Sequence, residues 1–183
     1  FCDPDAGQVD AARALRAAGS TLKPFIYAEA MSGGICAPGT RVRDAPVRYG
    51  GYAPGNFDGA YRGDVTVAQA LSDSLNTPAV RMVAALGTNR VETLFRRLGI
   101  LAYGYRNPGG LALALGCAGH RLVDVVAAYR TLVQEEAKSE KQKGISTSTA
   151  ARLARDCSPY LTFTPSPRPN LQQLQQSQHR QHR

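Results

Sequence analysis

Ser20 and Lys23 stand three positions apart in the sequence, a spacing that could bring a hydroxyl and an amine together. Residues i and i+3 share one face of a helix, so the two side chains would be neighbours there. Lys23 is also the only lysine in residues 1–133, which contain thirteen arginines. A guanidinium stays protonated in any protein site, whereas a desolvated ammonium can lose its proton and act as a base. The Ser-x-x-Lys pattern therefore predicts a serine nucleophile that a neutral lysine activates.

A lysine base needs surroundings that lower its pKa. Reaching a pKa of about 7 to 8 takes roughly 4 kcal/mol, so the site must be largely closed to water. Most residues from Phe25 to Met31 are apolar and precede Gly33 and Gly34, which predicts a buried helix that begins near Ser20. The alternative interpretation is an ordinary N-cap serine beside a solvated lysine, because these common residues also meet at this spacing by chance.

Ser74 and Asn76 form a second polar pair, Ser-x-Asn, in a connection between two predicted helices. Thr66 is expected to cap the first helix, and Thr77 with Pro78 to open the next. Two short polar groups at such a junction could pass a proton and hold an amide, as a serine acyl-transfer site requires. Serine and asparagine are also ordinary helix-end residues, so the pair indicates an acyl-transfer site only because it follows Ser-x-x-Lys in the sequence.

The chain resembles the transpeptidase domain of penicillin-binding proteins, most closely the class A bifunctional enzymes of the 1C type. The resemblance runs from about residue 5 to about residue 132 and depends on several segments in the same order. These are GSTLKPFIY (19–27), YAPGNFD (52–58), SLNTPAV (74–80) and LALALG (111–116), which leads to AAY (127–129).

The resemblance implies a role for each matching polar residue. Ser20 would attack the D-Ala-D-Ala carbonyl of a peptidoglycan stem peptide, or a β-lactam ring, and Lys23 would be its base. Ser74 would relay the proton toward the leaving group, and Asn76 would hydrogen-bond the substrate amide. The family uses no cofactor or metal, is inhibited covalently by β-lactams, and cross-links peptidoglycan at the periplasmic face of the bacterial inner membrane. The parent protein is accordingly expected to be membrane-anchored.

The implied architecture is the α+β fold of serine β-lactamases and DD-transpeptidases, in which a five-stranded antiparallel sheet packs between helices. This chain is expected to hold mainly the helical part, with most of the central antiparallel sheet missing. An irregular stretch is expected over residues 35–65. Helices are expected at about 20–32, 67–74, 78–86, 89–98 and 121–132.

The family's third motif, Lys-Thr-Gly on an edge strand, does not occur in this sequence. Its absence predicts a DD-transpeptidase fragment that is inactive or very weak, and the alternative is a non-catalytic remnant or binding module. Composition also changes after residue 133, where glycine nearly disappears and a Gln/His/Arg-rich end follows. We therefore expect a partial transpeptidase domain over 1–133 and a polar, largely disordered, non-homologous tail over 134–183, with a short helix at 149–156. A frame change or truncation would produce such a tail, and a family-specific tail is the alternative.

Charge and cysteine content exclude several other classes. The net charge is +8, but no base-stacking aromatic pattern or recognition-helix signature accompanies it, so nucleic-acid binding is not expected. No apolar run reaches the ~18 residues of a membrane helix, and the start at Phe1 shows no signal peptide, so we expect an internal fragment. The cysteines and histidines lack the paired spacing of zinc ligands, so a zinc site is not expected. Cys117 and His120 are expected to be a small buried residue and a helix-start residue rather than a catalytic pair.

Overall fold

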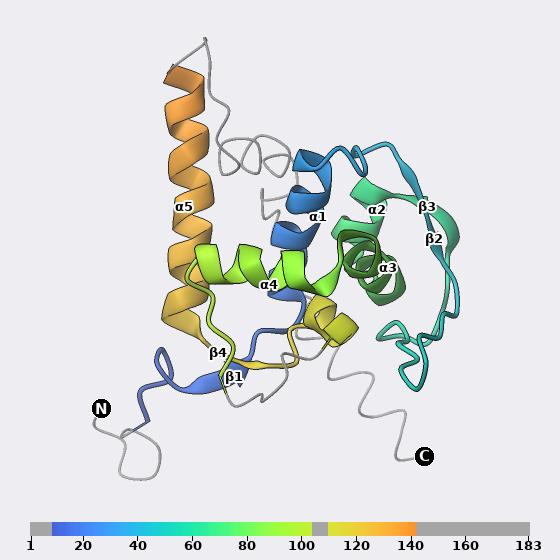
Figure 1. Cartoon of the computed structure of the whole chain (residues 1–183), viewed down its shortest axis with the longest axis horizontal. Helices are drawn as coiled ribbons and strands as arrows, with labels where there is room; N and C mark the ends of the chain where they lie inside the picture. Colours follow the sequence, from blue (N-terminus) through green and yellow to red (C-terminus); the bar gives the residue numbers. More distant parts are fainter. Residues whose placement is uncertain (1–8, 104–109, 142–183) are drawn as a thin grey trace, which may run out of the picture.

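The computed structural model describes residues 9–103 and 110–141 (Figure 1). Helix α5 stands along one side of this part of the chain and strands β2 and β3 lie along the other, with α1, α2 and α3 between them. In chain order the elements are β1 (Leu15–Ala17), the 3-10 helix η1 (Gly19–Leu22), α1 (Lys23–Ser32), β2 (Arg41–Asp44), β3 (Gly63–Thr66), α2 (Val67–Ser72), α3 (Asn76–Leu86), α4 (Thr88–Arg97), the 3-10 helix η2 (Gly110–Leu115), β4 (Gly119–Arg121) and α5 (Leu122–Lys141).

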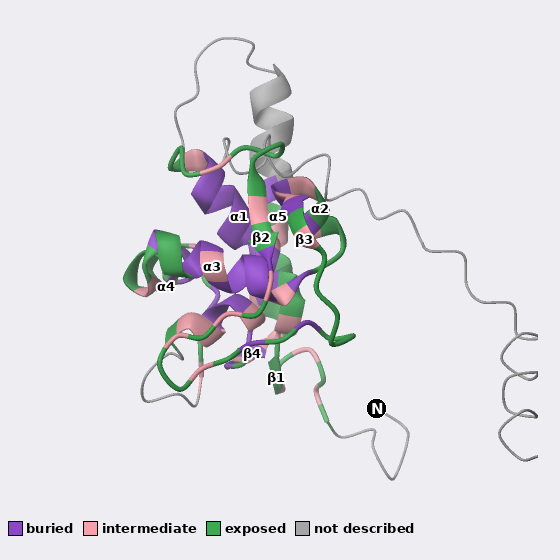
Figure 2. Ribbon diagram, turned by 90° about the vertical axis from the view of Figure 1, so that its right-hand side faces the viewer, coloured by how far each residue is buried: buried purple, intermediate pink, exposed green. Residues whose placement is uncertain are grey.

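Helix α1 lies at the centre of the core, and Figure 2 shows buried residues concentrated on α1 and α3. Its apolar residues follow one another without a polar face, so the helix has to be covered on every side. Helices α2, α3 and α4 and the 3-10 helix η2 all contact it. Phe25, Ile26 and Tyr27 are fully buried, and each such side chain contributes roughly 1.5–3 kcal/mol of burial energy. This packing places the residue that opens the helix, Lys23, inside the protein.

The five helices expected from the sequence are all present, and the expected α+β fold, mostly helical with little sheet, is confirmed. Thr66 caps α2 as expected, in a capping box with Gln69. The expectation for Thr77 is wrong, because α3 begins at Asn76 and the N-cap residue is Leu75. The hydroxyl of Thr77 instead donates a hydrogen bond of 2.6 Å to a buried carboxylate, Asp44.

The stretch expected to be irregular contains a two-stranded antiparallel sheet. Strands β2 and β3 pair with Val42 opposite Val65 and Asp44 opposite Gly63. The strands are only four residues long and 18 residues lie between them, 45–62, so no local hairpin signal indicates their pairing. Alternation along β2 places Asp44 on the same inner face as Val42.

Strands β1 and β4 form a second antiparallel pair, in which Arg16 lies opposite His120. This pairing brings the segment before Ser20 next to the segment before α5. Two expectations for this segment are wrong. His120 is a buried strand residue rather than a helix-start residue, and Cys117 is exposed rather than buried. The His120 ring is held through Nδ1, 3.1 Å from the carbonyl oxygen of Leu101.

Helix α5 continues to Lys141, nine residues beyond its expected end. The residues that prolong it, from Val133 to Lys141, are mostly strong helix formers. The proposed domain division at 133/134 stays a prediction, and the possible helix at 149–156 lies outside the described residues. None of the helices in residues 9–103 and 110–141 combines the length and apolar content that crossing a bilayer requires.

Candidate active site

Ser20 lies in η1, a single 3-10 turn that leads directly into α1. The Ser20 side chain is exposed, while the neighbouring Leu22 is fully buried and anchors the turn. Within the turn, the Thr21 hydroxyl donates to the Ala18 carbonyl at 2.6 Å, and the Lys23 N–H donates to the Ser20 carbonyl. The turn therefore presents the Ser20 hydroxyl to solvent from a fixed backbone.

Two residues from distant parts of the chain hold this turn in place. Gly19 N–H donates to the Gly116 carbonyl at 3.2 Å, and a Cβ added at Gly116 would lie 2.5 Å from the Gly19 nitrogen. On the other side, the Tyr129 hydroxyl of α5 donates to the Thr21 carbonyl at 2.7 Å. The Tyr129 ring also packs edge-on against Phe25, with ring centroids 4.7 Å apart. Neither support could be derived from local sequence patterns.

We expect Gly116→Ala to displace the turn that carries Ser20. The added methyl group would overlap the Gly19 backbone, and overpacking of this kind typically costs about 1–3 kcal/mol. Gly50→Ala is the matched control, since Gly50 has the same positive φ of 58° but no neighbour within 4 Å of an added Cβ. Thermal unfolding of both variants should show the larger loss for Gly116→Ala, and equal losses would mean that the close approach is unimportant.

Lys23 is buried, with 1% of its surface exposed, and its amine reaches across to the start of α3. Lys23 Nζ donates to the Ser74 carbonyl at 2.6 Å, to Ser74 Oγ at 3.2 Å and to Asn76 Oδ1 at 2.7 Å. All three acceptors are neutral, so no counter-charge among them stabilises the ammonium. Burial lowers the pKa of Lys23 to about 8. At pH 7, one unit below this value, about a tenth of the amine is therefore neutral.

Ser74 lies at the junction between α2 and α3 with φ at 54°, in the left-handed region. Among the described residues it is the only one other than glycine with a positive φ. This conformation costs an L-residue about 1–2 kcal/mol, and here it coincides with a carbonyl and a hydroxyl that both face Lys23. Strained backbone of this kind tends to gather at functional sites.

Asn76 is the first residue of α3, and its amide is oriented by two partners. Its Nδ2 donates to the Gly55 carbonyl at 2.8 Å, which leaves Oδ1 to accept from Lys23. Because Nδ2 carries two hydrogens and Gly55 takes one, a second donor remains for a ligand. The amide side chain could thus bind a substrate carbonyl without releasing Lys23.

Three of the four residues singled out from the sequence, Lys23, Ser74 and Asn76, are brought into one hydrogen-bonded group. Ser20 stands in the 3-10 turn that leads into Lys23, and within the part of the chain that the structure describes no hydrogen bond joins Ser20 Oγ to Lys23 Nζ. Catalytic hydrogen bonds are often formed only with substrate present, so this geometry is compatible with a nucleophile and base. Within the same residues no cluster of His, Cys, Asp or Glu side chains is placed to hold a metal ion.

Comparison with known proteins agrees with this arrangement of elements. The model of the family described as "Penicillin binding protein transpeptidase domain" matches residues 6–111, more than half of the chain. The solved structure of penicillin-binding protein 1A from Haemophilus influenzae superposes with a TM-score of 0.61 at 27% identity, covering 69% of this chain and 19% of that one. The fold is thus part of the serine transpeptidase fold. The chain belongs to the penicillin-binding protein transpeptidase family.

Similarity extends to curated members of the family. Penicillin-binding protein 1C of Escherichia coli is 41% identical over 127 residues, which cover 67% of this chain and 16% of that protein. Penicillin-binding protein 1A of Neisseria meningitidis is 36% identical over 129 residues, covering 65% of this chain and 15% of that protein. The chain therefore spans about a sixth of the length of the curated relatives it matches.

The sequence analysis did not identify Asp44 and Asn56, which hold the residues of the site in place. Asp44 could have been found from the alternation Arg-Val-Arg-Asp, which places a carboxylate on the same face as Val42. Asn56 stands inside the segment YAPGNFD, whose resemblance to the family assigns it no role. Their partners lie 12 to 33 positions away in the sequence, beyond the reach of any local pattern.

Proposed function

We propose that this chain carries the acylating centre of a serine DD-transpeptidase, with Ser20 as nucleophile and Lys23 as its base. The observation that supports this most is the state of Lys23. It is buried and bonded only to neutral acceptors, and its pKa is lowered to about 8, three properties that a solvated surface lysine would lack. A general base works best when its pKa lies near the working pH.

The proposed reaction begins with transfer of the Ser20 hydroxyl proton to neutral Lys23. Ser20 Oγ attacks the carbonyl carbon of the D-Ala-D-Ala bond, and the backbone N–H of Ser20 is one donor to the resulting oxyanion. Ser74 Oγ, 3.2 Å from Lys23 Nζ, passes a proton to the departing nitrogen of the terminal D-Ala. The peptide C–N bond breaks and an ester on Ser20 remains.

The second half of the reaction returns the serine. An amine of a neighbouring stem peptide attacks the ester carbonyl, and a new peptide bond replaces the bond to Ser20. The proton lost by that amine returns through Lys23 to Ser20 Oγ. With a β-lactam in place of the stem peptide, opening of the ring gives the same ester, but the former leaving nitrogen stays attached.

The proposed partners follow from the reaction. Peptidoglycan stem peptides would be the substrates and β-lactams the covalent inhibitors, acting at the periplasmic face of the inner membrane. One relative, PonA1 of Mycobacterium tuberculosis, has been solved in complex with penicillin V, and it superposes on 70% of this chain with a TM-score of 0.61. The competing proposal is a non-catalytic binding module, because this sequence has no Lys-Thr-Gly strand motif to complete the oxyanion site.

Covalent labelling separates these two proposals. We expect a fluorescent penicillin, after prolonged incubation with the chain, to form an adduct that peptide mapping places on Ser20. Ser20→Ala should remove the adduct completely, whereas Ser72→Ala, at an exposed serine near the same junction, should leave it unchanged. An adduct on Ser72 or Ser74 would refute the assignment. A folded chain that forms no adduct at all would favour the binding module.

A further inference from the structure

Asp44, at the end of β2, is a fully buried carboxylate outside the four residues described above. Its oxygens accept from the hydroxyl of Thr77 at 2.6 Å, from the backbone N–H of Arg62 at 2.8 Å and from Asn56 Nδ2 at 2.9 Å. Burial by itself would raise the pKa of Asp44, but hydrogen bonds from Thr77, Asn56 and Arg62 outweigh it and hold the pKa below the ordinary value. Asp44 is therefore ionised in the folded protein and acts only as an acceptor.

An acceptor-only partner fixes the orientation of the Asn56 amide. Asn56 Nδ2 faces the Asp44 carboxylate and also donates to the Ala60 carbonyl at 2.8 Å, so its two hydrogens are used. Asn56 Oδ1 then points the other way and accepts from the backbone N–H of Asn76 at 2.8 Å. Rotating the amide by half a turn would place Oδ1 against two acceptors, which is unfavourable.

This bond supplies what α3 lacks in its own sequence. A helix begins with N–H groups that have no partner within the helix, and the N-cap residue of α3, Leu75, has no side chain able to accept one. Asn56 therefore caps the helix from a loop 20 residues upstream. Its neighbour Gly55 binds the Asn76 side chain through its carbonyl. Two adjacent loop residues thus hold Asn76: Asn56 binds its backbone N–H and Gly55 binds its side chain.

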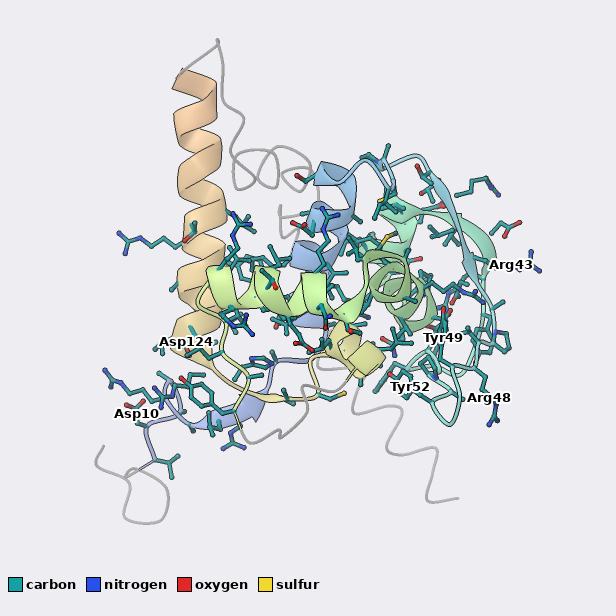
Figure 3. The ribbon with its side chains drawn as sticks, in the orientation of Figure 1. Asp10, Arg43, Arg48, Tyr49, Tyr52 and Asp124 are labelled. Carbon is teal, nitrogen blue, oxygen red and sulfur yellow. The ribbon has the colours of Figure 1, made fainter. Side chains whose placement is uncertain are left out.

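The loop that carries these residues joins β2 to β3. Figure 3 shows Tyr49 and Tyr52 on its inner side and Arg48 on its outer side. Tyr49 and Tyr52 exchange backbone hydrogen bonds of 2.9 and 3.0 Å and pack partly against the core, which anchors the loop before it reaches Asn56. The loop is therefore anchored to the core and can hold Asn56 in a fixed position.

We propose that Asp44 and Asn56 are positioning residues that hold the start of α3, and through it Asn76, against Lys23. The chain of contacts runs from the Asp44 carboxylate to the Asn56 amide, from there to the Asn76 backbone, and from Asn76 Oδ1 to Lys23 Nζ. The inference rests on the proposed function for its catalytic meaning. Its test reads the Lys23 amine and the Asn76 amide directly, so it can succeed or fail whether or not Ser20 is acylated.

The first test uses Asn56→Ala, which removes the cap without changing charge. We expect the Asn76 amide proton to exchange at least tenfold faster, and the Lys23 pKa, followed by NMR of ¹³C-labelled lysine, to rise by about one unit as water enters. The chain has four lysines, and Lys23→Met assigns the signal. Asp64→Asn is the matched control, because Asp64 is an exposed carboxylate of β3 that pairs with Arg43, outside this chain of contacts, and it should change neither reading.

The second test separates positioning from a simple charge effect. Removing a negative charge would by itself lower the Lys23 pKa, whereas a loosened site would raise it toward that of a solvated lysine. We expect Asp44→Asn to raise it. An unchanged Asn76 amide in Asn56→Ala, or a lowered Lys23 pKa in Asp44→Asn, would overturn the proposal.

Discussion

Replacing Lys23 with arginine should slow acylation of Ser20, with a loss of at least about 100-fold in the rate of penicillin labelling. General base catalysis alone contributes roughly 100- to 10,000-fold, and a guanidinium cannot supply it because it stays protonated. The positive charge is retained in this variant, so an effect of charge alone predicts little change. The measurement is the time course of fluorescent-penicillin labelling, compared at equal protein concentration.

The control for this substitution is Lys141→Arg, which makes the same chemical change at the far end of α5. It should label like the unchanged chain. Circular dichroism and thermal unfolding of Lys23→Arg should show that the variant is folded, because a larger side chain must fit where Lys23 is buried. Normal labelling by a folded Lys23→Arg variant would mean that Lys23 is not the base.

The rate of acylation should rise with pH and reach half its maximum near pH 8. The neutral fraction of Lys23, whose pKa is lowered to about 8 by burial, falls about tenfold for each pH unit below that value. Between pH 5 and pH 9 we therefore expect an increase of roughly 1,000-fold. The measurement is the second-order labelling rate at constant ionic strength across this range.

Unfolding measurements provide an independent check on the same pKa. A folded-state pKa below that of the unfolded chain means that the unfolded chain binds more protons between the two values. The free energy of unfolding should consequently gain a contribution from Lys23 as pH rises from about 8 toward the ordinary lysine value of 10.5. This contribution should vanish in Lys23→Met. A labelling profile that is flat from pH 6 to pH 9 would contradict the role of Lys23 as base, and an unfolding free energy that does not change with pH in this range relative to Lys23→Met would contradict the lowered pKa.

Local patterns in the sequence determined the helical framework and the chemical type of the site. The apolar run after Lys23 requires a buried helix, and the Thr66 capping box fixes where α2 begins. These features depend on residues within one or two helical turns of each other, so they can be predicted without knowledge of the fold. The order of Ser-x-x-Lys and Ser-x-Asn then indicated the family, which the comparisons confirmed.

Tertiary structure alone decided which groups surround the amine of Lys23. The i, i+3 spacing suggested a direct contact with Ser20, yet the amine is bonded to Ser74 and Asn76, which lie 51 and 53 positions away. Asp44 and Asn56 came to the site only because β2 pairs with a strand that follows an 18-residue loop. Burial of Lys23, and with it the lowered pKa, results from packing α1 among α2, α3, α4 and η2. Such contacts depend on how distant segments meet, and local periodicity carries no information about that.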